Sequence, residues 1–245
     1  MTEKKLRNYL SARFETPKTS KILIPTVLSD SKGERLRNVV TNTFDQNIVW
    51  WCKSGDNIQS RINWLKENLE QKIRLLGQIH LYVWLGTCDL TTRDKNGYIS
   101  INTNQSDTVE FLIRKYREIS DIVSTYSGSK VTFLEVPIYS IVTYNSHRGH
   151  PDPQKFVTQD SSLLESIHNL NQKSQELNKE LGTISPSFNR SLYSNTKHKT
   201  QNRQATETRY QYSLHFYTDG LHPTPLLSRV WLKKLAVQIK HDCWL

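Results

Sequence analysis

The sequence predicts an α/β protein, a three-layer α/β/α sandwich in which helices cover both faces of a central, mostly parallel sheet. Three observations lead to this prediction. Short apolar runs rich in β-branched residues alternate with longer segments whose apolar residues recur at helical spacing. The apolar runs are continuous, which is typical of strands buried on both faces of a parallel sheet. The length of 245 residues fits one domain of this class.

Four apolar runs are expected to form the strands of the sheet. Each contains Ile, Val, Leu or aromatic residues and is followed by turn-forming residues. The first run includes Pro25, which cannot donate a hydrogen bond to a neighbouring strand. The expected strands are residues 21–28, 47–52, 80–85 and 131–136.

Helices are expected between these strands and at the end of the chain, because apolar side chains there form one-sided stripes. Asp107 and Glu110 match a capping box at the start of one of them. The polar segment 90–105 and the His-, Gly- and Pro-rich segment 147–153 are expected loops. The expected helices are residues 34–44, 57–75, 109–123, 163–177 and 226–239.

The chain divides into an N-terminal arm and one domain. Residues 1–20 are polar and basic and are expected to be an arm or a short helix, with a frayed terminus as the simpler interpretation. Residues 21–245 form the domain. Within it, residues 186–210 carry Ser, Asn, Thr, Gln, Lys and Arg with almost no apolar side chain, which predicts a polar, basic insertion or a disordered surface loop.

Composition excludes several classes of protein. Hydrophobic residues make up 36% and aromatic residues 10% of the chain, enough for a core, so wholesale disorder is excluded. No apolar run approaches the roughly 20 residues of a membrane-spanning helix, and the charged N-terminus leads into no apolar signal segment. The cysteines Cys52, Cys88 and Cys243 match neither a disulfide framework nor a zinc pattern. We therefore expect an intracellular protein, cytoplasmic or nuclear.

The formal net charge of +10 favours either a polyanionic partner such as nucleic acid or an ordinary soluble basic surface. Basic residues of the insertion lie close in sequence to Tyr193 and Tyr210, and bases stack on such aromatic rings in single-stranded nucleic-acid sites. A solvated loop is the alternative interpretation. The candidate nucleic-acid contacts are Arg190, Lys197, Lys199, Arg203 and Arg209.

Residues suited to acyl transfer follow the predicted strands. In doubly wound sheets function lies at the carboxyl ends of the strands. Ser31 follows the first strand, Gly55 follows the second, and Asp219 with His222 precedes the last helix. A histidine can take the proton of a serine hydroxyl, and a carboxylate fixes the tautomer of that histidine. The ordinary alternatives are a helix-capping role for Ser31 and a simple turn at Gly55.

Four short blocks resemble, in order and position, those of GDSL-type hydrolases of the SGNH superfamily. The resemblance extends over about residues 21–240 and implies the flavodoxin-like SGNH hydrolase fold. The blocks read Ser-Asp-Ser at 29–31, Ser-Gly-Asp at 54–56, Gly-Thr-Cys-Asp at 86–89 and Asp-Gly-Leu-His at 219–222.

The resemblance also assigns expected roles. It implies a catalytic triad of Ser31, Asp219 and His222, with no metal or organic cofactor. The oxyanion hole would consist of the backbone N–H groups of Ser31 and Gly55, with Cys88 at its third position.

The chain departs from the family pattern in two places. Ser29 stands where the family has the first glycine of its first block, which a turn tolerates if it needs no positive φ. Cys88 stands where the family has an asparagine whose amide donates to the oxyanion. A thiol is a weak donor, and loss of one oxyanion donor costs on the order of 10²–10³ in rate. Cys88 itself could be a nucleophile, although a core or loop thiol is the simpler interpretation.

Two functional hypotheses remain open. The first is an esterase that hydrolyses a small acyl ester, weakened by Cys88. The second is a catalytically impaired domain that binds nucleic acid or acts in assembly, since SGNH-like esterase domains also occur in open reading frames of eukaryotic retroelements. His147 and His150 could suggest a metal, but a solvated loop explains them more simply. Trp50 and Trp51 are expected core residues, with pocket lining as the alternative.

Overall fold

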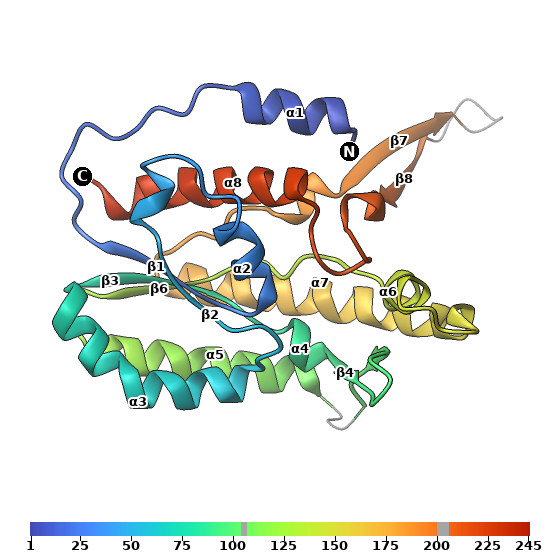
Figure 1. Ribbon diagram of the computed structural model, residues 1–245, viewed down its shortest axis with the longest axis horizontal. Helices are drawn as coiled ribbons and strands as arrows, with labels where there is room; N and C mark the ends of the chain where they lie inside the picture. Colours follow the sequence, from blue (N-terminus) through green and yellow to red (C-terminus); the bar gives the residue numbers. More distant parts are fainter. Residues whose placement is uncertain (104–106, 200–205) are drawn as a thin grey trace.

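A four-stranded parallel sheet forms the centre of the molecule, with the strand order β2-β1-β3-β6. The computed structural model describes residues 1–103, 107–199 and 206–245, and the side chains of all of these except 194–199 and 206–211. Helices cover both faces of the sheet, so the predicted three-layer α/β/α sandwich is confirmed (Figure 1). The strands are β1 (Ile24–Ser29), β2 (Val49–Cys52), β3 (Ile79–Trp84) and β6 (Lys130–Phe133).

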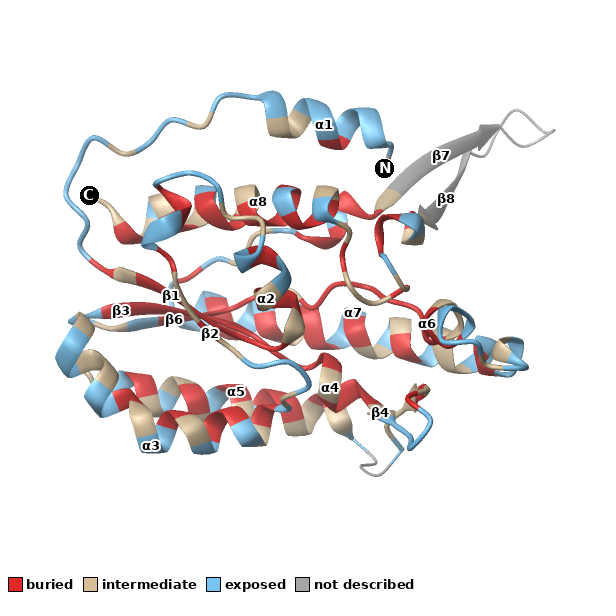
Figure 2. Ribbon diagram, in the orientation of Figure 1, coloured by how far each residue is buried: buried red, intermediate tan, exposed pale blue. Residues whose placement is uncertain are grey.

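The helical layers differ in depth. On one side α3 (Ile58–Leu76) and α5 (Thr108–Ser124) pack together, with α7 (Val157–Glu180) beside α5. On the other side lies α8 (Pro225–Cys243), and α1 (Glu3–Ser11) lies outside α8 as a further layer (Figure 1). Figure 2 shows β1, β3, β6 and the inward helix faces mainly buried, β2 largely intermediate, and the outward helix faces mainly exposed.

The strands are buried because their apolar runs lie between these layers. All six residues of β3 are buried, and Val27 and Leu28 of β1 have no exposed surface. Pro25 is tolerated inside β1 because the pairing with β2 begins only at the next residue, opposite Val49. The N–H of Ile24 donates to the Gln78 carbonyl, which lies just before β3. Successive N–H groups of a strand point to opposite sides, so an N–H at position 25 would point toward β2, which has not yet begun there.

The carboxyl ends of three strands are level with one another. Ser29 pairs with Cys52 of β2 and with Trp84 of β3. The segments that follow these strands therefore meet at one edge of the sheet. These are the helix α2 (Ser31–Arg37), the turn at Gly55 and the short helix α4 (Thr87–Leu90).

Several expected boundaries are wrong. The helix expected over residues 34–44 begins at Ser31, because Asp30 caps its N-terminus, and it ends at Arg37. The expected loop 90–105 contains a short antiparallel pair, β4 (Thr91–Arg93) and β5 (Ile99–Ile101). The helix α6 (Ile141–His147) was not expected. Short 3₁₀ helices are η1 (Asp45–Asn47), η2 (Pro153–Phe156), η3 (Asn189–Ser191) and η4 (Leu214–Phe216).

The expected insertion at 186–210 begins inside the fold. Phe188 and Leu192 are fully buried, so the first residues of this segment belong to the core and not to a surface loop. Beyond it the backbone forms β7 (Tyr193–Lys199), which pairs antiparallel with β8 (Thr206–Tyr212).

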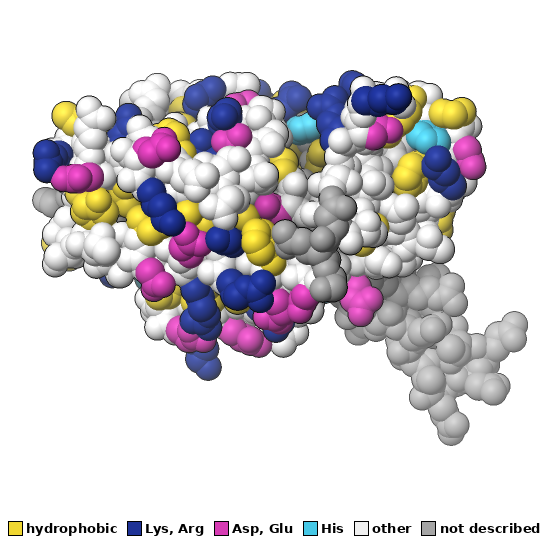
Figure 3. Space-filling model, turned by 90° about the horizontal axis from the view of Figure 1, so that it is seen from below, with side chains coloured by type: hydrophobic (Ala, Val, Ile, Leu, Met, Phe, Trp, Pro, Cys, Tyr) yellow, Lys and Arg dark blue, Asp and Glu magenta, His cyan; other side chains and the backbone are white. Residues whose placement is uncertain are grey.

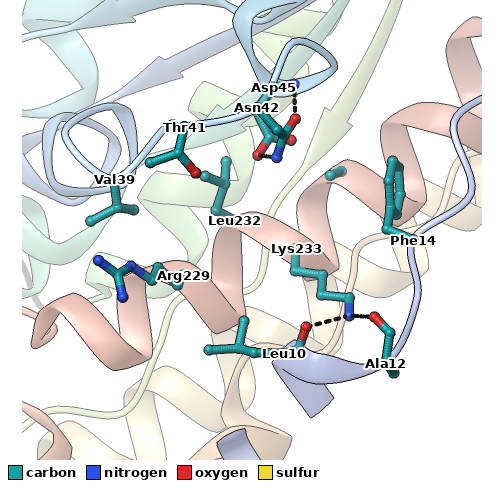
Figure 4. A pocket seen from close by; sticks show the side chains of 11 residues that line it. Leu10, Ala12, Phe14, Val39, Thr41, Asn42, Asp45, Arg229, Leu232 and Lys233 are labelled. Carbon is teal, nitrogen blue, oxygen red and sulfur yellow. Dashed lines mark hydrogen bonds between the residues drawn. The ribbon is translucent and has the colours of Figure 1, made fainter. Parts of the chain in front are cut away.

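The N-terminal segment is held against α8. Leu6 of α1 is only 2% exposed, and Lys233 Nζ donates to the carbonyl oxygen of Tyr9. It also donates to the carbonyl oxygens of Leu10 and Ala12 at the end of α1 (Figure 4). Lys240 Nζ donates to the carbonyl of Glu15 at 2.6 Å. The interpretation as a frayed terminus is therefore wrong, and the short helix is what forms. No helix in the described ranges is long and apolar enough to cross a membrane.

Candidate active site

A continuous chain of hydrogen bonds joins Ser31, His222 and Asp219. Ser31 Oγ lies 3.1 Å from His222 Nε2, and His222 Nδ1 lies 2.6 Å from Asp219 Oδ2. Ser31 begins α2, while the other two lie just before α8. The three residues predicted from sequence are thus brought together, and all three side chains are half-buried.

The turn that carries Asp219 and His222 is tightly built. Asp219 Oδ1 accepts the backbone N–H of Leu221 at 3.0 Å and that of His222 at 2.7 Å. Between them Gly220 has φ +89°, and a Cβ there would lie 2.8 Å from the backbone nitrogen of Tyr144. Glycine is therefore required both by the backbone conformation and by the lack of space.

These bonds keep the carboxylate of Asp219 ionised. Burial raises its pKa, but the donors from the His222 ring and from the backbone of His222 and Leu221 outweigh burial and bring the pKa to about 2. An anionic carboxylate bonded to Nδ1 holds a proton on that nitrogen and leaves Nε2 free to accept one from Ser31.

A buried ion pair supports the turn that carries Ser31. Asp30 is 1% exposed and Lys32 is 3% exposed, and Lys32 Nζ lies 2.6 Å from Asp30 Oδ2. Asp30 Oδ1 also accepts the Lys32 N–H at 2.9 Å, and Lys32 Nζ donates to Thr87 Oγ1 at 2.5 Å. The first and third sequence blocks are therefore connected by one lysine. The sequence analysis missed this residue, although opposite charges on either side of Ser31 were a visible signal.

Ser29, which replaces a family glycine, has a structural role. The described residues contain no positive φ outside glycine, so this position does not need one. Ser29 Oγ donates to the Trp84 carbonyl at 3.1 Å and accepts the Gly33 N–H at 3.1 Å. The hydroxyl thereby ties the start of α2 to β3.

Two backbone donors at this edge remain unused. The N–H groups of Ser31 and Gly55 have no acceptor among the described residues. Ser31 begins α2, where the free N–H groups and the helix dipole favour negative charge. Gly55, with φ +76°, lies in the exposed turn after β2.

The third block is occupied by a neutral thiol and a structural carboxylate. Burial raises the pKa of the Cys88 thiol to about 12, so Cys88 is a weak donor and a poor nucleophile near neutral pH. Both carboxylate oxygens of Asp89 lie 3.2 Å from the N–H of Ile58, which ties α4 to the start of α3. Burial raises the pKa of Asp89 to about 6 despite this bond.

The histidines of segment 147–153 serve local structure. His147 ends α6. His150 packs edge-on against Tyr98 and Phe156, and its Nδ1 accepts the Asp152 N–H at 2.9 Å. Within the described ranges no group of three His, Cys, Asp or Glu side chains is placed to hold a metal ion.

The adjacent tryptophans lie at the edge strand of the sheet. Trp51 is 8% exposed and its ring centroid lies 5.3 Å from that of Trp64. Both Trp50 and Trp51 line an open cavity of about 610 Å³ beside β2.

Most of the candidate nucleic-acid contacts have side chains outside the residues that the structure describes. Arg190 is exposed. The side chains of Lys197, Lys199 and Arg209 and the whole of Arg203 lie outside the described residues. Figure 3 shows Lys and Arg lying among Asp and Glu over the described part of one face, without a continuous basic patch there.

Comparisons with known proteins bear on the fold. No protein-family model matches the chain, and no curated protein sequence matches it. Solved structures do. A lipase/acylhydrolase from Enterococcus faecalis aligns with a TM-score of 0.54 at 12% identity, covering 91% of this chain and 97% of its own. A GDSL-like lipase from Bacteroides thetaiotaomicron aligns with a TM-score of 0.54 at 13% identity, covering 98% and 96%.

An acetyl xylan esterase also aligns, with a TM-score of 0.53 at 11% identity, covering 86% of this chain and 96% of its own. These likenesses establish that the chain has the fold of the GDSL-type SGNH hydrolases, as the sequence resemblance implied.

Proposed function

We propose that the chain is a serine hydrolase that cleaves a small acyl ester through Ser31, His222 and Asp219. One observation carries the proposal, the unbroken hydrogen-bond chain of 3.1 Å and 2.6 Å from Ser31 Oγ through the imidazole to the carboxylate. Nucleophile, base and orienting acid lie at these separations in serine hydrolases of unrelated folds. The structural neighbours that are named as lipases and an esterase add support at the level of the fold.

In the first step Ser31 Oγ bonds to the ester carbonyl carbon and its proton passes to His222 Nε2. Asp219 stabilises the resulting imidazolium. The carbonyl oxygen becomes an oxyanion, which the free N–H groups of Ser31 and Gly55 are available to bind. His222 then gives its proton to the alkoxide oxygen as the carbon–oxygen bond breaks, leaving an acylated Ser31 and a free alcohol.

In the second step water takes the place of the alcohol. His222 accepts a proton from the water as its oxygen bonds to the acyl carbon. Collapse of the second tetrahedral intermediate returns the proton to Ser31 and releases the carboxylic acid. Because Cys88 provides a thiol in place of an amide donor, turnover should be slower than with three good donors, by up to about 10²–10³.

The test is hydrolysis of p-nitrophenyl acetate by the wild-type protein and by Ser31→Ala. We expect the variant to fall to the rate of buffer alone. Ser162→Ala is the matched control, because Ser162 is an exposed serine on α7 whose hydroxyl bonds only to the Thr158 carbonyl. Equal rates in wild type and Ser31→Ala would overturn the proposal.

A further inference from the structure

A second cavity lies on the outer side of the molecule, between α1, α8 and the segment that precedes β7. Its volume is about 500 Å³, within the range of small-molecule sites. Ser31, Asp219 and His222 do not line it. The cavity is therefore separate from the candidate active site.

The charged side chains that line this cavity are all cations. They are Lys5 of α1, Arg190 of η3 and Lys234 of α8. The nearby carboxylate of Glu135 is not part of the lining, and it already accepts the Asn189 N–H at 2.7 Å. No carboxylate in the lining therefore balances these cations.

Lys234 shows this lack of compensation most clearly. Its ammonium makes one hydrogen bond, to the Ser187 carbonyl at 2.5 Å. Burial lowers its pKa, Glu135 partly opposes this, and Arg190 lowers it further, to about 8. A bound anion would stabilise the charged form of this lysine.

An unpaired hydroxyl lies in the same wall. Ser191 is 1% exposed, lines the cavity, and its Oγ has no hydrogen-bond partner among the described residues. Buried side-chain polar atoms nearly always have a partner. A ligand oxygen bound beside Arg190 could provide it.

Apart from Ser187 and Gln238, the rest of the wall is mainly apolar. Leu6 and Tyr9 contribute from α1, Pro186 from the segment before β7, and Val230 and Val237 from α8. Val237 is 50% exposed although it is a large apolar side chain. An alkyl chain lying here would remove this surface from water, at about 25 cal/mol per Å².

We propose that this cavity binds a single-chain anionic amphiphile, with its oxyanion head group at Lys234, Arg190 and Ser191 and its alkyl chain between α1 and α8. Charge complementarity selects the head group, and the apolar wall selects the chain. A polynucleotide is a poorer fit, because it would leave the apolar wall uncovered.

The experiment measures laurate binding by isothermal titration calorimetry to the full chain. Wild type and Ser31→Ala should bind equally, because the cavity does not include the nucleophile. Lys234→Met and Arg190→Met should each weaken binding at least about tenfold, as expected for loss of a charge-assisted bond. Lys179→Met is the matched control, since it removes an exposed lysine at the end of α7, and it should change nothing.

Four further arms make the test decisive. Dodecanol and dodecyltrimethylammonium should bind at least tenfold more weakly than laurate, and inorganic phosphate should not compete, because each lacks the anion or the chain. Val237→Asp puts a carboxylate at an exposed position of the wall and should abolish binding while the melting temperature is kept.

Several results would overturn the proposal. Laurate could bind Lys234→Met and Val237→Asp with the affinity of wild type. Dodecanol could bind as tightly as laurate, or Ser31→Ala could lose laurate binding. Any one of these results would contradict the proposal. Displacement of laurate by a short single-stranded oligonucleotide would instead assign the cationic residues to a nucleic-acid surface. None of these outcomes depends on whether the protein hydrolyses esters.

Discussion

The candidate active-site edge and the outer face of α8 both draw charged side chains out of water, but they compensate the charge differently. At the active-site edge the buried cations have carboxylates as partners. Lys32 pairs with Asp30, and Arg61 pairs with Asp56 at 3.3 Å. On α8, Lys233 and Lys234 donate to backbone carbonyl oxygens, with no carboxylate within salt-bridge distance in the described residues.

The difference separates charge that serves structure from charge that can serve a ligand. An ion pair at the edge is neutral overall and positions Ser31. A lysine held by a carbonyl remains positive and can attract an anion from solution. Some of the cations behind the formal charge of +10 therefore form bonds within the protein, so the net charge alone is a poor indicator of a nucleic-acid surface.

The largest expected effect, on kcat, comes from removing the carboxylate of the proposed triad. Asp219→Asn should lower kcat by about 10⁴, because the amide no longer fixes the required imidazole tautomer. It should also change acid stability. Since folding holds the pKa of Asp219 at about 2, its contribution to stability is present above its ordinary value near 3.8 and is lost as the pH falls toward 2.

Steady-state kinetics and acid unfolding followed by circular dichroism measure the two effects. A loss of activity below tenfold, or an acid transition identical to that of wild type, would contradict the assigned role of Asp219.

The comparison itself is tested by removing one buried lysine from each region. Lys32→Met leaves Asp30 buried without its partner and should lower the free energy of unfolding by about 3–5 kcal/mol. Lys234→Met removes no ion pair, only a bond to a carbonyl and the burial of an ammonium, and should change it by less than about 1 kcal/mol. Urea unfolding measures both. Equal losses in the two variants would contradict the distinction.

A smaller effect is expected from restoring an amide donor in the third block. Cys88→Asn should raise kcat by up to about 10², if residue 88 faces the oxyanion. Cys88→Ala is the control, because it removes the thiol without adding a hydrogen-bond donor. An unchanged kcat in Cys88→Asn would show that this position does not contact the oxyanion.

The smallest effect concerns the carboxylate that caps α3. Because burial raises the pKa of Asp89 to about 6, its protonated form is favoured by folding, and the associated stability is full below about 3.8 and is lost as the pH rises through 6. Asp89→Asn does not ionise, so it should gain about 1–3 kcal/mol over wild type between pH 4 and pH 8. Urea unfolding at the two pH values measures this, and parallel pH profiles would contradict it.

Local patterns in the sequence predicted the sheet and singled out the residues of the proposed triad. The four strands were visible because each is a buried apolar run, and the triad was visible because Ser31, Asp219 and His222 stand in short blocks beside those strands. The end of α2 was misplaced because Val39 and Val40 continue the apolar pattern beyond the helix, and they are only half-buried.

What the sequence could not predict depends on contacts between distant residues. Lys233 holds the end of α1 from 224 positions away, and no local pattern reports such a contact. Lys32 is buried only because Thr87 and Asp30 meet it at the sheet edge. The cavity between α1 and α8 is equally invisible in the sequence, since it exists only once the two helices are packed together.

The most direct test of the central claim is whether the hydrogen-bond chain makes Ser31 an unusually reactive serine. A fluorophosphonate reagent forms a bond between Ser31 Oγ and phosphorus and releases fluoride, with His222 taking the serine proton. Mass spectrometry of the digested protein should find the adduct on the peptide that contains Ser31, and His222→Gln should slow labelling at least about 10²-fold. Labelling at other serines instead, or an equal rate in His222→Gln, would contradict the account.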